Sequence, residues 1–330
     1  MKKILVVFCI SLSAFSLKAQ YREHVDSVLV KEWVCYLASD QMKGRANGSQ
    51  ESLEAALYIR DKFKEYGLTP PEKYPYHIQD YNFTDRSQKI ISERNVIGVL
   101  EGKKGTSEKD HIILTAHLDH IGIKDAINGD SIYNGANDNI TGISALLGIA
   151  RYFQLNNLQP ERTLVFVAFS AEEIGFDGSK YYVENPVLPV KRAYVNMNFE
   201  LLGHCSKLGK KRFYISGPGY SSFEDIVKEY FQDKTWDYAE NPDMSGWLMF
   251  ASDNVSFLRV KKDLTHYHGI PAHTLVMYDG EDHLHKPWDE AKYIDFSNLT
   301  GFINSISDFV YKLSFSKEEI KMLKSRYRKL

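Results

Sequence analysis

The chain has 330 residues, of which 43% are hydrophobic and 25% are charged, as is ordinary for a globular protein with a substantial core. Its 41 basic and 43 acidic residues leave a formal net charge of −2, which excludes a strongly basic nucleic-acid surface and a polybasic membrane anchor. The length suits one large α/β domain or two smaller ones, and no linker rich in Pro, Gly or Ser divides the chain.

Residues 1 to 19 have the features of a signal peptide. Two lysines precede a short apolar run, and Leu17-Lys18-Ala19 resembles a small-residue cleavage site. The apolar run is short for a transmembrane helix, so an N-terminal membrane anchor is the weaker alternative. We therefore expect an exported protein, periplasmic or extracellular and without stable membrane insertion, with residues 20 to 330 as a single catalytic domain.

Only Cys35 and Cys205 lie beyond that segment. Two cysteines are too few for a disulfide scaffold, although an oxidising compartment would permit one bridge between them. Nothing in the sequence places them side by side, so the pairing stays open.

Hydrophobic periodicity predicts an amphipathic helix at residues 23 to 38, a loop at 39 to 45, and a second helix that begins after Ser49 and ends near Gly67. The later elements are an irregular or edge-strand segment at 69 to 90, strands at 95 to 100, 111 to 116, 163 to 169, 193 to 199 and 272 to 278, turns at 102 to 109 and 215 to 219, and helices at 140 to 152, 179 to 184, 221 to 231, 291 to 313 and 317 to 330. Strands that alternate with helices predict an α/β fold, a three-layer α/β/α sandwich around a mixed, mostly parallel sheet.

Candidate metal ligands follow the predicted strands, where ligand sites of open α/β sheets lie. The candidates beyond strand ends are His117, Glu172, Glu173, Glu200 and His285, and Asp138 lies in a glycine-bearing loop before the helix at residue 140. Imidazole and carboxylate are ligand types that suit zinc. Five such ligands from separate segments would suit a pair of zinc ions, with one acid left unligated.

Each group also has a less specific interpretation. Asp138 can simply cap the helix that begins near Ile140. Two acids followed by Gly175 can form a solvated loop, Glu200 can pair with a basic side chain, and a histidine after a strand is often a surface or satisfied core residue. The coincidence of all these groups at successive strand ends favours a metal site.

The combination resembles the secreted zinc aminopeptidases, a family of two-zinc metallopeptidases that includes glutamate carboxypeptidases and, more distantly, glutaminyl cyclases. The motifs that carry the resemblance are His117-Leu118-Asp119-His120, Gly135-Ala136-Asn137-Asp138-Asn139-x-x-Gly142, Glu172-Glu173-x-Gly175 and His285-x-Pro287-x-Asp289, with weaker similarity at Gly44-Arg45, Ser252-Asp253 and residues 269 to 272. The resemblance spans about residues 36 to 296 and implies a zinc-exopeptidase fold of the phosphorylase/hydrolase-like type.

The resemblance also implies a role for each site residue. Asp138 would bridge two zinc ions, with His117 and Glu200 completing one position and Glu173 and His285 the other. The family pattern further implies that Glu172 is the general base and acid, while Asp119 accepts the imidazole N–H of His117. Such a site hydrolyses peptide substrates through a metal-activated water.

Two positions depart from the family pattern. Glu200 stands where the family commonly has Asp, which bears on the occupancy of one metal position. Asn254 follows Ser252-Asp253 where the family often has His, so we expect an altered supporting role there.

Three functions stay open on the sequence. The leading hypothesis is an aminopeptidase that removes N-terminal residues from peptides. The alternatives are a glutaminyl cyclase-like acyltransferase with one zinc, and a catalytically inactive binding protein on the same fold. Residue specificity and oligomeric state cannot be deduced from the motifs.

Overall fold

A computed structural model of the chain describes residues 22–103, 111–204, 207–232, 234–239, 242–260, 269–280 and 282–323. The predicted signal peptide, Cys205 and most of the predicted turn at 102 to 109 lie outside the described residues. The cleavage site, the domain boundary at residue 20 and the disulfide therefore stay predictions. Cys35 is exposed. No helix in the described ranges is both long and apolar enough to cross a bilayer.

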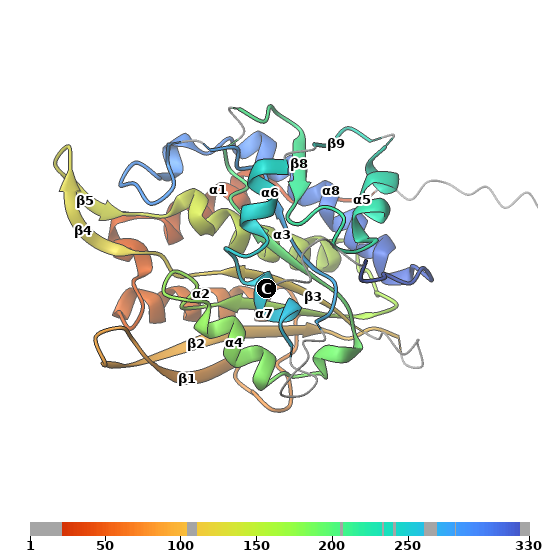
Figure 1. Cartoon of the computed structure of the whole chain (residues 1–330), viewed down its shortest axis with the longest axis horizontal. Coiled ribbons are helices and arrows are strands. Elements are labelled where there is room, and N and C mark those ends of the chain that lie inside the picture. Colours follow the sequence, from red (N-terminus) through yellow and green to blue (C-terminus); the bar gives the residue numbers. More distant parts are fainter. Residues whose placement is uncertain are drawn as a thin grey trace, which may run out of the picture.

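An eight-stranded sheet forms the centre of the molecule (Figure 1). Its order is β1 (Ile78–Thr84), β2 (Ile90–Leu100), β6 (Thr163–Phe169), β3 (His111–His117), β7 (Ala193–Glu200), β10 (Ala272–Val276), β8 (Arg212–Ile215) and β9 (Asp237–Tyr238). Strands β6, β3, β7 and β10 run parallel, whereas β1 with β2, β2 with β6 and β10 with β8 pair antiparallel. The predicted mixed, mostly parallel sheet is confirmed.

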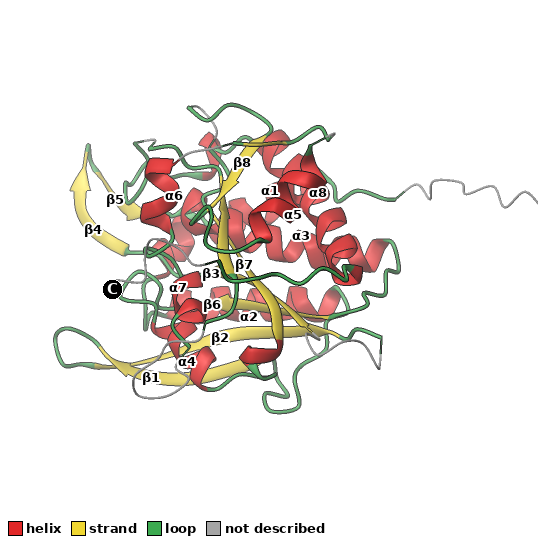
Figure 2. Ribbon diagram, turned by 45° about the vertical axis from the view of Figure 1, so that its right-hand side comes forward, coloured by secondary structure: helices red, strands yellow, loops and turns green. Residues whose placement is uncertain are grey.

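Helices cover both faces of this sheet (Figure 2). One face carries α1 (Ser27–Leu37), α2 (Gln50–Glu65), α3 (Thr141–Leu155), α5 (Phe223–Phe231) and α8 (Phe296–Phe315), and the other carries α4 (Asp177–Glu184) and α7 (Asn254–Leu258), which follows α6 (Pro242–Leu248). Alternate side chains of a strand point to opposite faces. Accordingly, Leu164 and Phe166 of β6 join the core under α3, while Val165 and Val167 join the core on the other face.

A second, two-stranded sheet projects from the body as a hairpin of β4 (Gly122–Ile127) and β5 (Asp130–Tyr133) (Figure 1). Four short helical turns complete the described elements: η1 (Asp40–Arg45), η2 (Ala136–Ile140), η3 (Val190–Arg192) and η4 (Ala291–Tyr293). The hairpin and η2 both belong to the long segment between β3 and α3, so this segment reaches from the sheet to the surface.

Two local predictions were wrong, and a third is confirmed in one of its two forms. Residues 40 to 45 form the helical turn η1 rather than a plain loop, whereas the segment at 69 to 90, predicted as irregular or an edge strand, contains the edge strand β1. The described part of the predicted helix at 317 to 330 is not helical, and Met322 makes an isolated β-bridge with Ser221. The backbone of Lys321 donates to Ser222 Oγ (2.9 Å), and Leu323 N donates to the Tyr220 carbonyl (3.0 Å). These bonds to the segment before α5 take the place of helical ones.

The side chain of Arg45 links the end of α1 to the two segments that flank the β4–β5 hairpin. Its guanidinium is fully buried and donates to the carbonyl oxygens of Leu37, Leu118, Asn134 and Gly135 at 2.7 to 3.0 Å. The preceding Gly44 has φ 65°, and a Cβ there would lie 2.2 Å from the Tyr133 carbonyl oxygen. The Gly44-Arg45 pair is therefore required by close backbone packing.

We predict that Arg45→Met lowers the free energy of unfolding by at least ~3 kcal/mol, because it leaves several buried carbonyls without a donor. The measurement is urea unfolding followed by circular dichroism. Arg60→Met is the matched control, since Arg60 pairs with Asp61 on the surface at 2.8 Å and should change the stability by no more than ~1 kcal/mol. Equal effects of the two substitutions would contradict the structural role of Arg45.

Candidate metal centre

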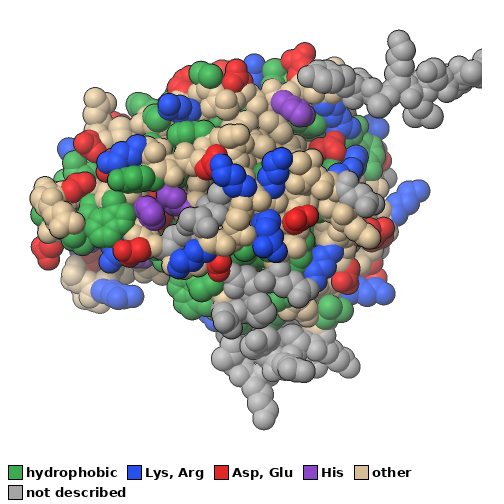
Figure 3. All heavy atoms as spheres, turned by 90° about the horizontal axis from the view of Figure 1, so that it is seen from above, with side chains coloured by type: hydrophobic (Ala, Val, Ile, Leu, Met, Phe, Trp, Pro, Cys, Tyr) green, Lys and Arg blue, Asp and Glu red, His purple; other side chains and the backbone are tan. Residues whose placement is uncertain are grey.

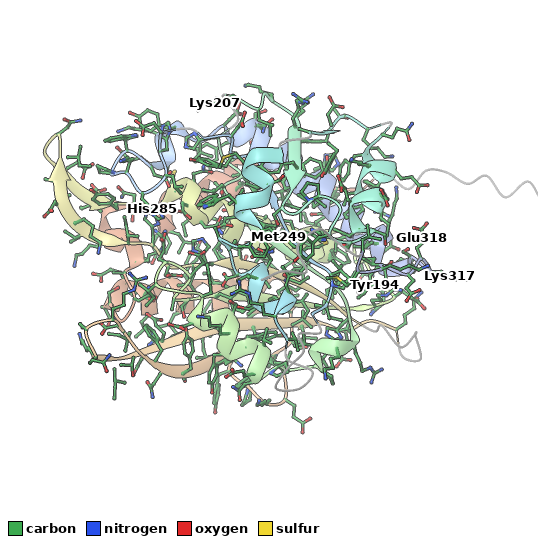
Figure 4. All side chains as sticks on the ribbon, viewed as in Figure 1. Tyr194, Lys207, Met249, His285, Lys317 and Glu318 are labelled. Atoms are coloured by element: carbon green, nitrogen blue, oxygen red, sulfur yellow. The ribbon has the colours of Figure 1, made fainter. Side chains whose placement is uncertain are left out.

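The predicted ligands converge at the carboxyl ends of the parallel strands. His117 and Glu200 are the last residues of β3 and β7, Glu173 follows β6, and His285 lies in the loop after β10. Figure 4 shows His285 at the opposite end of the molecule from Tyr194, which lies near the start of β7. Histidine side chains also reach the surface on the side seen in Figure 3. The polar residues at the carboxyl ends of the parallel strands thus lie together at one site.

His117, Asp138 and Glu200 form one half of the site. The Nε2 atom of His117 lies 3.2 Å from Asp138 Oδ1 and 3.3 Å from Glu200 Oε1. All three side chains are buried. The longer side chain of Glu200 therefore still brings its carboxylate to His117.

Asp138, Glu173 and His285 form the other half. The Nε2 atom of His285 lies 3.2 Å from Asp138 Oδ2 and 3.0 Å from Glu173 Oε2. The two oxygens of Asp138 therefore face two different imidazoles. This is the arrangement of a carboxylate that bridges two positions.

The structure gives Asp138 no role in capping α3. The residue before this helix is Ile140, which makes no side-chain cap, and the first-turn N–H of Gly142 donates to Asn139 Oδ1 (3.1 Å) rather than to Asp138. The Asp138 loop is held instead by Asp289, whose carboxylate accepts hydrogen bonds from the backbone N–H groups of Asn137 (2.8 Å) and Asp138 (3.0 Å). The motif of His285 and Asp289 thus supplies one candidate ligand and orients another.

Asp119 supports the site through more contacts than the sequence suggested. The closest oxygen to His117 Nδ1 is the Asp119 main-chain carbonyl at 3.2 Å, whereas the carboxylate is 3.8 Å away. That carboxylate accepts hydrogen bonds from Asn47 Nδ2 and from the backbone N–H groups of Glu172 and Glu173. Burial raises the pKa of Asp119 to about 6. Its position therefore fixes both the His117 ring and the paired glutamates.

Glu172 lies beside the first half of the site. One of its oxygens is within 4.8 Å of ligand atoms of His117 and Glu200. Burial, with the neighbouring carboxylates of Glu200 and Glu173, raises the pKa of Glu172 well above its usual value, although His117 opposes this shift. A carboxyl group with a raised pKa can accept and return a proton near neutral pH.

His120 joins the cluster but was not among the predicted site residues. Its Nδ1 atom lies 2.7 Å from Glu173 Oε1 and 3.7 Å from Asp138 Oδ2, and the side chain is buried. Its place in the strand-end segment His117-Leu118-Asp119-His120 was the available signal. The family motif draws attention only to the first and third of these residues.

The side chains present fit a metal pair. The Nε2 atom of His117 and Oε2 of Glu200 are buried and make no hydrogen bond to any described residue. Ligand atoms ~2.0–2.1 Å from a tetrahedral zinc ion are ~3.3 Å apart, which matches the separations of 3.0 to 3.3 Å in both halves of the site. Nitrogen and oxygen donors of this kind suit zinc.

Residues 95–310 match the sequence profile of Peptidase family M28. The chain belongs to this peptidase family. The resemblance predicted from the motifs is thereby confirmed, and the family is one of peptidases, as those motifs implied.

Individual relatives of the M28 chain agree with this membership. Aminopeptidase YwaD of Bacillus subtilis is 24% identical over 243 residues, which are 72% of this chain and 48% of that protein. This chain spans about half or less of the length of the curated relatives that it matches. BSAP, a zinc aminopeptidase from Bacillus subtilis, shares the fold with a TM-score of 0.68 and 16% identity, over 92% of this chain and 100% of that one.

A glutaminyl cyclase from Bacteroides thetaiotaomicron shares the M28 chain's fold equally clearly. Its TM-score is 0.64 at 17% identity, over 88% of this chain and 99% of that one. The predicted fold class is confirmed by these structures. At such low identity they establish the fold alone.

We predict that zinc stabilises the folded protein, because a divalent cation offsets the buried carboxylates. Free zinc at ~100 times its dissociation constant should add ~2.7 kcal/mol and raise the melting temperature by several degrees. The measurement is differential scanning calorimetry with added zinc and after treatment with EDTA. Asp138→Asn should respond much less than the wild type. An identical melting temperature with zinc and with EDTA would contradict this prediction.

Proposed function

We propose that the protein is a zinc-dependent exopeptidase, specifically an aminopeptidase that hydrolyses the N-terminal residues of peptides. Membership of an M28 peptidase family supports the reaction class. The observation that carries the two-metal proposal is Asp138, whose oxygens each lie 3.2 Å from a different imidazole. His117, Asp138 and Glu200 would hold one zinc ion, and Asp138, Glu173 and His285 the other.

The bound metals would supply Lewis acidity toward the peptide carbonyl and toward water. Glu172 would take the proton from the attacking water on a carboxylate oxygen and then pass it to the nitrogen of the leaving amine. Its burial beside His117 and Glu200 supports this role, as does its raised pKa. Asp119 would hold the backbone of Glu172 so that the carboxylate keeps its position.

We predict that Glu172→Gln lowers kcat by ~10²–10⁴-fold, because the amide cannot accept the proton of the water. Zinc content should stay the same as in the wild type, since Glu172 is not an assigned ligand. The assay measures amine release from a panel of aminoacyl-amide substrates. Glu184→Gln, which changes an exposed residue of α4, is the matched control and should keep full activity. Unchanged hydrolysis by the Glu172 variant would overturn the mechanism.

A glutaminyl cyclase is the second candidate, favoured by the fold shared with the Bacteroides thetaiotaomicron enzyme. A peptide with an N-terminal glutamine separates the two reactions. An aminopeptidase releases free glutamine, whereas a cyclase releases ammonia and leaves a pyroglutamyl peptide. A protein that forms neither product and binds no divalent metal would instead be an inactive binding protein on this fold.

Export is part of the same proposal. The charge and apolar pattern of residues 1 to 19 supports removal of this segment and action in the periplasm or outside the cell. N-terminal sequencing of the protein recovered from cell fractions tests this. A mature protein that still begins at Met1 and stays in the cytoplasm would contradict it.

A further inference from the structure

We propose that His120 is a fourth protein ligand at the metal position formed by Asp138, Glu173 and His285. This inference rests on the proposed two-metal site and extends it to a residue outside the expected ligand set. It makes the two positions unequal. One is closed by four protein ligands, and the other is held by His117, Asp138 and Glu200 alone.

His120 contacts the same two carboxylates as His285, at a hydrogen-bond distance from Glu173 and at 3.7 Å from Asp138. Its Nδ1 atom lies 2.7 Å from Glu173 Oε1, while the second oxygen of Glu173 lies 3.0 Å from His285 Nε2. One donor atom each from His120, Asp138 and Glu173 lie within 4.8 Å of one another. The ring centroids of His120 and His285 are 5.6 Å apart, and two imidazoles on one tetrahedral ion have centroids ~5 Å apart. The two rings therefore flank the same carboxylates, at a centroid separation slightly longer than that of two imidazoles on one ion.

Packing fixes the orientation of the His120 ring. The side chain is 1% exposed, and its ring lies directly against Gly135, where a Cβ would sit 2.5 Å from the ring Cγ. Gly135 has φ 60°, and its carbonyl accepts a hydrogen bond from Arg45. The glycine at the start of the Asp138 loop thus leaves room for the imidazole, and the ring presents Nδ1 to the carboxylates.

The difference in the number of protein ligands gives the two metal positions different tasks. Structural zinc sites are closed by four protein ligands, whereas catalytic sites keep a position open for water or substrate. Glu172 lies beside His117 and Glu200, and so adjoins the three-ligand position. The position with His120 would therefore hold its ion more tightly, and the position next to the base would present the open site.

The first test measures zinc affinity by competition with a chromophoric chelator. The wild type should bind two zinc ions of unequal affinity, and His120→Ala should weaken the tighter one at least ~10-fold, as His285→Ala should. His24→Ala removes an exposed imidazole near the N-terminus that belongs to neither metal position, and it should leave both affinities unchanged. Two wild-type-like affinities in the His120 variant would overturn the inference.

A spectroscopic test distinguishes a ligand from a residue that only positions Glu173. Cobalt(II) at a four-ligand position gives a strong visible absorption band, which should weaken or shift in His120→Ala. X-ray absorption of the zinc-loaded wild type needs no variant and should count ~1.5 imidazoles per zinc, whereas ~1 would overturn the inference. Wild-type protein that binds no zinc would overturn the proposed function itself, so the two failures are distinguishable.

Discussion

The site depends on the compensation of buried negative charge. Carboxylates from four separate segments meet in a region that is largely closed to water, and a buried charge is costly unless it is paired. Burial alone raises the pKa of Asp138, yet His117 and His285 hold it well below the usual value. Burial dominates at Glu200 and raises its pKa. Two imidazoles therefore compensate part of this charge, and divalent cations between the carboxylates would compensate the remainder.

The surrounding structure places these charges through polar contacts between distant segments. Arg45 binds the carbonyls of the segments on either side of the β4–β5 hairpin, and Asp289 holds the backbone of the Asp138 loop. Asp119 does the same for the two glutamates after β6, and Asn47 links Ala171 of that turn to Asp119. None of these residues is an assigned ligand. Their hydrogen bonds fix the positions of the candidate ligands through contacts between segments that are far apart in the sequence.

The sequence was sufficient for the parts of the fold with strong local patterns. Strands β3 and β6 are mostly apolar runs, and β7 is apolar apart from two asparagines; all three are buried on both faces, so their ends and the polar ligands there could be located. The segment that contains strand β1 could be predicted only as irregular or an edge strand, because polar residues such as Asp80 and Asn82 interrupt its apolar pattern. The place of His120 could not be deduced, since its partner Glu173 lies 53 positions along the chain. Only the three-dimensional packing brings the two together.

The central claim is that Asp138 bridges two metal ions, one toward His117 and one toward His285. The most direct measurement is a crystal structure of the zinc-loaded protein with anomalous diffraction at the zinc edge. We expect two anomalous peaks ~3.5–4 Å apart on either side of the Asp138 carboxylate. A single peak, or two peaks that do not share Asp138, would contradict this account.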